Sequence, residues 1–337
     1  MYAADAPGHR LALALVPLRF GFLADQELIW YEGPAGAAPA EMTEAGRVDG
    51  GEDVAMYMSG SAEAAGAAVV VAPPGSSIAV SSGFTYSAAG RVEHGAPVVA
   101  TGIAEVRLAP APSDPGTTVT VTRDGRTLYQ GRAWGGWAGQ AGQDPQEPTE
   151  AMVSRALGDH TFDRATLRQW IRSALSDARL PAAGTTAAVR WTGTVDGQPA
   201  LLLTLRRQGS GVLAYAMHGG ADSWRTDLRL LLPAAGAENR PLAWRLRAEG
   251  KDDRTDRVVV VVPPGTGRAT LTVAGAAPTP LTLDPSGSAV TTLAPDAAAT
   301  VTAYPADGGT PAGTPVPPFE TDSGGLPGDT PKTRVVD

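Results

Sequence analysis

The sequence predicts a mostly β protein of two tandem β-sandwich-like modules, the second of which carries one amphipathic α-helix. Four observations lead to this prediction. Glycine and proline are frequent, with 41 and 29 residues among 337, which is typical of short strands joined by turns. A strand-turn-strand phrase occurs twice, and one segment has helical periodicity. Hydrophobic residues make up 43% of the chain, enough to build real cores.

The repeated phrase is an apolar β-branched run that ends in Pro-Pro-Gly. Residues Val69–Ser76 read VVVAPPGS, and Val259–Thr266 read VVVVPPGT. Proline lacks the N–H that a strand ladder needs, so the phrase predicts an apolar strand, a rigid break and a return strand. It indicates an internal duplication, and the alternative is chance recurrence in a GC-rich β protein. Gly95–Val98 and Gly287–Val290 extend the match, each ahead of an expected strand.

Residues 1–137 are expected to form the N-terminal β module. The signal-like stretch Leu11–Ala24 contains Pro17 and Arg19 and is therefore interpreted as a first strand, with any export segment expected upstream. Asp124-Gly125 is a hairpin-turn signature. The expected strands are Leu11–Phe22, Glu27–Tyr31, Val54–Met58, Ala67–Ala72, Ile78–Ser81, Phe84–Ser87, Val98–Ala100, Ala104–Leu108, Thr117–Thr122 and Thr127–Gly131.

A polar segment with two prolines, residues 138–150, is predicted to be a linker. The C-terminal β module then spans 151–304 and carries the helix, predicted over 162–179 with Thr161 as its cap. Apolar residues recur there at three- and four-residue spacing and predict one buried stripe: Leu167, Trp170, Ile171, Ala174, Leu175 and Ala178.

The remaining strands of the second module follow the helix. They are Val189–Val195, Ala200–Arg206, Gly211–Met217, Leu228–Leu232, Leu242–Leu246, the run from Val258, Ala269–Val273, Leu281–Leu283, Val290–Leu293 and Thr300–Tyr304. Residues 305–337 are rich in proline, glycine and threonine and poor in apolar residues. This composition predicts a disordered tail.

Charge and cysteine content exclude several classes of function. The net charge is −8 and no dense basic stretch occurs, so nucleic acid is not an expected partner. No run of 18 apolar residues exists, so no membrane span is expected within the chain. Cysteine is absent, which excludes disulfides, thiolate metal sites and a cysteine nucleophile.

No familiar catalytic motif is present. The histidines are His9, His94, His160 and His218, and none forms a pair at metal-ligand spacing. The G-x-S-x-G, phosphate-loop and G-x-G-x-x-G patterns are also missing. We therefore expect no metal, no cofactor and no catalytic residues of a known type.

The most suggestive cluster is the aromatic segment 129–137, with Tyr129, Gln130, Arg132, Trp134 and Trp137 as candidate ligand-binding residues. The tryptophans could stack on sugar rings or anchor a peptide, while Gln130 and Arg132 bond hydroxyls. The alternative is a strand end whose tryptophans seal the core, since large aromatic side chains are mostly buried.

Trp191-Thr192-Gly193, Asp196–Leu201 (DGQPAL) and the valine run with Pro-Pro-Gly carry a family resemblance. Residues 150–305 resemble uncharacterised extracytoplasmic proteins of actinobacteria, which are usually anchored by one N-terminal membrane helix that is not visible in this chain. The resemblance implies a cell-envelope location and no known activity.

The expected function is that of a non-enzymatic extracytoplasmic module, secreted or at the cell surface, with a structural or protein-binding role. Two alternatives stay open. One is a glycan-binding module that uses the aromatic segment, and the other is a hydrolase with an unrecognised site. A protein or a cell-wall glycan is the expected partner.

Overall fold

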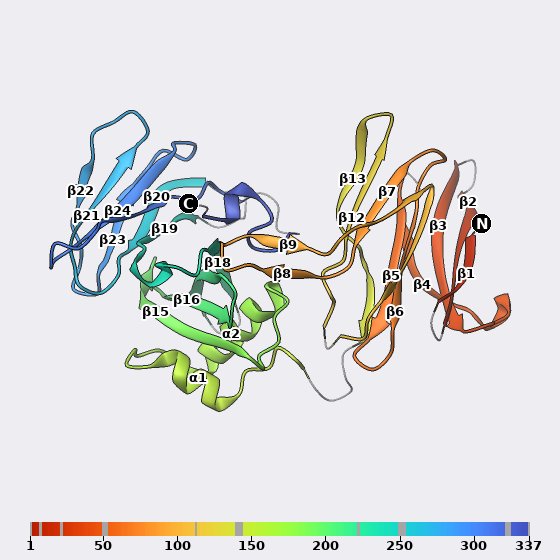
Figure 1. Ribbon diagram of the computed structural model, residues 1–337, viewed down its shortest axis with the longest axis horizontal. Coiled ribbons are helices and arrows are strands. Elements are labelled where there is room, and N and C mark those ends of the chain that lie inside the picture. Colours follow the sequence, from red (N-terminus) through yellow and green to blue (C-terminus); the bar gives the residue numbers. More distant parts are fainter. Residues whose placement is uncertain are drawn as a thin grey trace. The chain divides into compact units, whose positions relative to one another are not determined.

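The computed structural model describes residues 2–6, 9–20, 23–48, 53–111, 113–138, 144–220, 223–248, 254–320 and 325–335. These residues are mostly in strands, so the prediction of a mostly β chain is confirmed (Figure 1). The chain divides into two compact units. Unit 1 is Met1–Phe84 with His94–Pro145, and unit 2 is Thr85–Glu93 with Gln146–Asp337.

Unit 1 holds three four-stranded sheets, antiparallel except where β14 runs parallel to β5. The first is a meander of β1 (Tyr2–Ala6), β2 (His9–Phe20), β3 (Leu23–Pro34) and β4 (Thr43–Val48). The second has the order β11 (Ile103–Leu108), β6 (Gly66–Val71), β5 (Ala55–Ser61) and β14 (Gly135–Ala138). The third has the order β10 (Val98–Thr101), β7 (Ser77–Ser81), β12 (Thr118–Arg123) and β13 (Arg126–Arg132).

Unit 2 contains a corresponding set of antiparallel sheets. Its meander is β15 (Thr185–Val195), β16 (Gln198–Arg207), β17 (Val212–Gly219) and β18 (Trp224–Leu232). A three-stranded sheet has the order β19 (Leu242–Arg247), β20 (Arg254–Val261) and β23 (Ser288–Thr292). A four-stranded sheet has the order β22 (Thr279–Leu281), β21 (Thr266–Val273), β24 (Ala299–Pro305) and β25 (Ala312–Pro315).

The two units repeat one strand order. In each, a four-stranded meander is followed by seven corresponding strands, if β14 and a two-stranded sheet described below are set aside in unit 1. The first, second and fifth of the seven lie in one sheet. The third, fourth, sixth and seventh form the other, in the order fourth, third, sixth, seventh. Strands β5, β6, β7, β10, β11, β12 and β13 thus correspond to β19, β20, β21, β22, β23, β24 and β25.

The Pro-Pro-Gly phrase occupies the same place in both copies, between the second and third of the seven strands. The N–H of Ser76 donates to the Pro73 carbonyl at 3.1 Å, and Thr266 N–H donates to Pro263 at 3.3 Å. The glycines have φ of 82° and 78°, the left-handed conformation that this turn requires. The sequence match of residues 95–98 with residues 287–290 is wrong. Residues 95–98 lead into β10, which corresponds to β22, whereas residues 287–290 lead into β23.

The valine runs of the central strands β6 and β20 are buried on both faces of their sheets, which explains why these runs are continuously apolar. In β6, Val70 packs in the core shared with β7 and β12, whereas Val69 packs against the meander. In β20, Val260 packs in the core shared with β21 and β24, and Val259 packs against the meander.

Val70→Ala and Val260→Ala are matched substitutions in unit 1 and unit 2. Each is expected to lower the free energy of unfolding of its unit by about 2 kcal/mol. Both side chains are fully buried, and each substitution removes two methyl groups. Urea titration followed by circular dichroism measures this. Val99→Ala is the control, since Val99 is 66% exposed. Tolerance of either buried change would contradict the repeated core.

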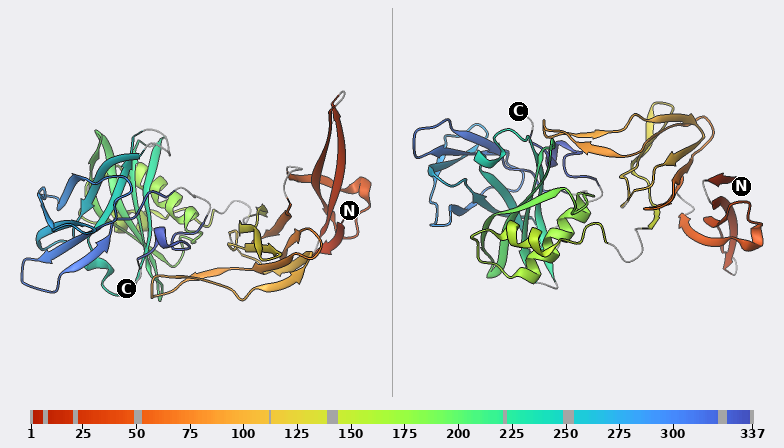
Figure 2. Two further views of the ribbon diagram at one scale, coloured as in Figure 1. Left: turned by 90° about the horizontal axis from the view of Figure 1, so that it is seen from above. Right: turned by 60° about the horizontal axis from the view of Figure 1, so that its bottom comes forward.

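Two helices lie in unit 2, α1 (Glu150–Leu157) and α2 (Arg164–Asp177) (Figure 2). The sequence predicted one helix over 162–179 capped by Thr161. Instead, the Asp163 side chain caps α2 by accepting from Thr166 N–H at 2.7 Å, and α1 begins within the expected linker. All the expected stripe residues of α2 are buried, together with Thr166. Neither helix of the described part of the chain is long and apolar enough to cross a membrane.

The described part of the C-terminal segment is ordered, so the prediction of a disordered tail over 305–337 is wrong there. Residues 312–315 form β25, and its few apolar side chains, including Val316, Phe319 and Val335, are buried. Val335 N–H donates to the Leu231 carbonyl at 2.9 Å. Apolar content underestimates order here because the few large apolar side chains are buried, Val316 and Val335 within core clusters.

A two-stranded sheet distinguishes the first set of seven strands from the second. Between β7 and β10 the chain forms the two-stranded sheet of β8 (Phe84–Tyr86) and β9 (Val92–His94). Residues 85–93 belong to unit 2, where the buried Tyr86 hydroxyl donates to the Ala178 carbonyl at 3.1 Å. The backbone carbonyls of Ser87 and Ala88 accept from Gly211 and Ala234.

Candidate functional site

A cleft of about 290 Å³ lies in unit 2 where the last strand of the meander, β18, meets β19. Helix α2 contributes Ser173, Ala174 and Asp177 to its wall, and β17 contributes Tyr215. The remaining lining residues are Thr226, Asp227, Leu228 and Arg229 of β18, Trp244, Arg245 and Arg247 of β19, and Pro317, Pro318, Phe319 and Glu320.

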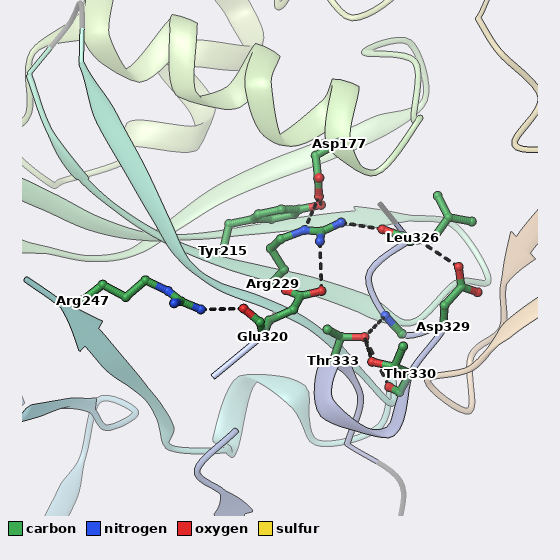
Figure 3. A network of polar contacts seen from close by, with 11 residues as sticks. Asp177, Tyr215, Arg229, Arg247, Glu320, Leu326, Asp329, Thr330 and Thr333 are labelled. Atoms are coloured by element: carbon green, nitrogen blue, oxygen red, sulfur yellow. Dashed lines mark hydrogen bonds and ion pairs between the residues drawn. The ribbon is translucent and has the colours of Figure 1, made fainter. Parts of the chain in front are cut away.

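Arg229 is the centre of a polar network on one side of this cleft (Figure 3). Its guanidinium donates to Asp177 Oδ2 at 2.9 Å, to Glu320 Oε1 at 3.0 Å and to the Gly325 carbonyl at 2.7 Å. Burial lowers the pKa of Arg229, but the Asp177 and Glu320 carboxylates outweigh it and the pKa rises. The network therefore ties α2, β18 and the C-terminal segment together.

Tyr215 completes this network from β17. Its hydroxyl donates to Asp177 Oδ2 at 2.8 Å. Burial, together with the neighbouring Asp177 charge, raises the pKa of Tyr215 well above its usual value. The phenol stays protonated and acts as a fixed donor, so it is unsuited to abstracting protons.

Two arginines of β19 hold the segment 317–320 in place. Arg245 is 4% exposed and donates to the carbonyls of Pro317, Ala294 and Ala297 at 3.1, 3.0 and 2.6 Å, while burial lowers its pKa. Arg247 donates to the Glu320 carbonyl. Both guanidinium carbons lie within 5.6 Å of the Phe319 ring centre, a favourable cation–π geometry.

His218 and Asp227 form a hydrogen-bonded pair beside the cleft, with 2.6 Å between Nδ1 and Oδ2. The Asp227 side chain is 2% exposed, and it sits where β18 carries one extra residue opposite β17. Within the described residues, its Oδ1 atom is buried and has no hydrogen-bond partner.

Among the described residues, no hydroxyl is hydrogen-bonded to the histidine of the His–Asp pair. A serine-type mechanism needs a hydroxyl in that position, whereas the hydrogen bond that the His218 side chain makes in the described part of the chain is the one with Asp227. The same part contains no group of three or more His, Cys, Asp or Glu side chains placed to hold a metal.

The aromatic segment predicted from sequence lies in unit 1, on β13 and β14. Gln130 and Arg132 are exposed, and Tyr129 is half-buried. The Tyr129 hydroxyl donates to the Arg132 carbonyl at 2.6 Å, and Arg132 donates to Asp114 Oδ2 at 3.3 Å.

Both tryptophans of this segment are half-buried and pack on the core of unit 1. The Trp137 indole donates to the Ala111 carbonyl at 2.8 Å, and a Cβ on Gly60 would come within 2.5 Å of its ring. The Trp134 ring meets Tyr57 edge-on at 5.9 Å. Ligand binding at this segment stays a prediction.

Sequence reasoning missed the cleft. A signal was present, because Arg229 and Arg245 each lie between apolar residues in β18 and β19. A charged residue inside such a strand needs a buried partner, yet the partners lie far away in sequence, as Glu320 does for Arg229.

Comparison with protein-family models, with curated proteins and with solved structures finds no match to this chain.

Proposed function

We propose that this protein is a non-enzymatic extracytoplasmic module with a structural or protein-binding role. The observation that carries the proposal is the repeated strand order, in which a meander and seven strands occur twice. Repetition of a scaffold builds extended surfaces and does not by itself create a reactive centre. The charged residues Arg229 and Arg245 fit this role, because they fix chain segments in place.

The proposal includes a finer architecture. Each set of seven strands is a β-sandwich with its two sheets packed face to face, covering residues 55–132 and 242–315. The second is accompanied by an amphipathic helix, α2, whose buried residues face the core. The duplicated Pro-Pro-Gly turns support descent from one ancestral module.

The extracytoplasmic location rests on the resemblance of residues 150–305 to actinobacterial envelope proteins. Immunodetection in fractions of the native cells tests it, with the protein expected in the envelope or the medium. Recovery in the cytosol alone would contradict the location.

Absence of turnover tests the non-enzymatic role. The full chain, incubated with peptidoglycan fragments, polysaccharides and chromogenic esters, is expected to release no product above buffer. The alternative, a hydrolase, predicts turnover that His218→Gln removes, because His218 is the histidine beside the cleft. Such a result would overturn the proposal.

The other alternative is glycan binding at the aromatic segment, favoured by the exposed Gln130 and Arg132 beside half-buried indoles. It predicts that Gln130→Ala with Arg132→Ala weakens binding to cell-wall polysaccharide, and that Trp134→Ala with Trp137→Ala abolishes it. Unchanged binding in both double variants, with folding verified by circular dichroism, would exclude this site.

A further inference from the structure

Strands β10 and β11 are edge strands of unit 1. In the described part of the chain each lies at the end of its sheet, β10 beside β7 and β11 beside β6, and Gly102 joins the two strands directly. Five large hydrophobic side chains are exposed among the described residues, and three of them lie here: Val98 at 48%, Val99 at 66% and Ile103 at 46%. Apolar side chains gathered along sheet edges mark an interaction surface.

The backbone of β11 presents the groups that a further strand would need. The Gly102 carbonyl accepts from the Ala72 N–H, directly after β6, at 2.9 Å, so it points toward β6. Backbone groups alternate in direction along a strand. The even-numbered residues of β11 therefore bond β6, and the odd-numbered residues direct their N–H and C=O groups toward the edge, where the described sheets end.

The side chains of β11 alternate in the same way. The even-numbered residues are buried, whereas the odd-numbered Ile103, Glu105 and Arg107 are exposed. The exposed face thus carries opposite charges two residues apart. Mixed charges protect an edge poorly against any strand that places an opposite charge across from each of them.

A second molecule of the same chain offers such a strand. When two β11 strands pair antiparallel with Val106 opposite Val106, Glu105 of each molecule lies directly opposite Arg107 of the other. A slip of two residues would instead place Glu105 opposite Glu105, or Arg107 opposite Arg107, which is unfavourable. A slip of one residue would set the buried face of one strand against the exposed face of the other. The order of the charges therefore selects one register.

We propose that two molecules of this chain associate by antiparallel pairing of β11 with β11, around a two-fold axis at Val106. The strand fits itself in charge, in its alternation of buried and exposed residues, and in the direction of its backbone groups, as an isologous contact requires. The inference rests on the proposed function and deepens it, since it names the partner of a structural module.

Reversal of the two charges tests the register. Analytical ultracentrifugation of the full chain over a series of concentrations is expected to show a dimer that dissociates on dilution. Glu105→Arg and Arg107→Glu each create two like-charge pairs and are expected to raise the dissociation constant by about tenfold or more. An equimolar mixture of the two variants restores both opposite-charge pairs in a heterodimer and is expected to recover the affinity. Arg126→Glu, at an exposed position of β13, is the control and is expected to leave the affinity unchanged.

A cysteine cross-link tests the two-fold axis independently. The chain contains no cysteine, so Val106→Cys introduces a single thiol. In the proposed dimer the two Cα atoms at this position lie roughly 4.5 Å apart, within the range of a disulfide. Mild oxidation is expected to give a covalent dimer on a non-reducing gel. Ile103→Cys is the control, because this more exposed position lies about 20 Å from its counterpart in the other molecule. Circular dichroism verifies that each variant is folded.

Three results would overturn the inference: the chain is a monomer at every concentration, mixing the two charge-reversed variants fails to recover the affinity, or Ile103→Cys cross-links more readily than Val106→Cys. Each would leave the non-enzymatic role standing. Turnover of an envelope substrate would instead contradict that role and leave the dimer standing.

Discussion

Arg229→Met is expected to lower the free energy of unfolding of unit 2 by about 3–5 kcal/mol, the usual cost of leaving buried charges unpaired. The Arg229 side chain is 9% exposed, and its loss removes one hydrogen bond each from Asp177, Glu320 and the Gly325 carbonyl. Methionine keeps the length of the side chain, so the loss reports the charge and its hydrogen bonds. Urea unfolding followed by circular dichroism is the measurement.

The matched control is Arg206→Met, which removes an exposed arginine from the same sheet and is expected to change stability by less than about 0.5 kcal/mol. Combining Arg229→Met with Asp177→Asn is expected to cost less than the sum of the single changes, because the two residues form one network. Equal effects of Arg229→Met and Arg206→Met would show that the network does not hold the C-terminal segment.

Trp170→Ala is expected to destabilise unit 2 by about 3–5 kcal/mol through the cavity that it leaves. The Trp170 side chain is fully buried, and its ring centre lies 5.3 Å from that of Phe162. Near-UV circular dichroism and urea unfolding detect the change. Gln169→Ala, at the exposed neighbouring position, is the control. A loss below about 1 kcal/mol would mean that α2 does not pack as described.

The features that local sequence encodes were predictable. The Pro-Pro-Gly turns need only four residues each, and Gly75 and Gly265 supply the positive φ. The stripe of α2, including Leu167 and Trp170, also follows from local spacing.

Features that depend on distant partners were not predictable. The Leu231 carbonyl accepts a hydrogen bond from the Val335 N–H, 104 positions later in the sequence. Amino-acid composition alone therefore could not predict that the C-terminal segment is ordered. The candidate cleft could not be predicted for the same reason, because Asp177, Arg229 and Glu320 come together only in the folded chain. The aromatic segment 129–137 was predicted to bind a ligand because of its composition, yet the Trp134 and Trp137 rings pack on the core of unit 1.

Differences between the copies suggest where specific roles reside. The first copy carries the two-stranded sheet β8–β9, of which residues 85–93 belong to unit 2. The second is preceded by α1 and α2 and has a cleft between β18 and β19. Such differences on a shared scaffold are where function diverges.

The most direct test of the repeated strand order is a set of cross-strand NMR contacts. Val70 is expected to show contacts to both Met56 and Ala104, and Val260 to both Ala243 and Ala289. Finding both sets would establish the same central strand, with the same two neighbours, in each unit. Pairing of Val260 with a strand other than β19 and β23 would contradict the repeated strand order on which the proposed function rests.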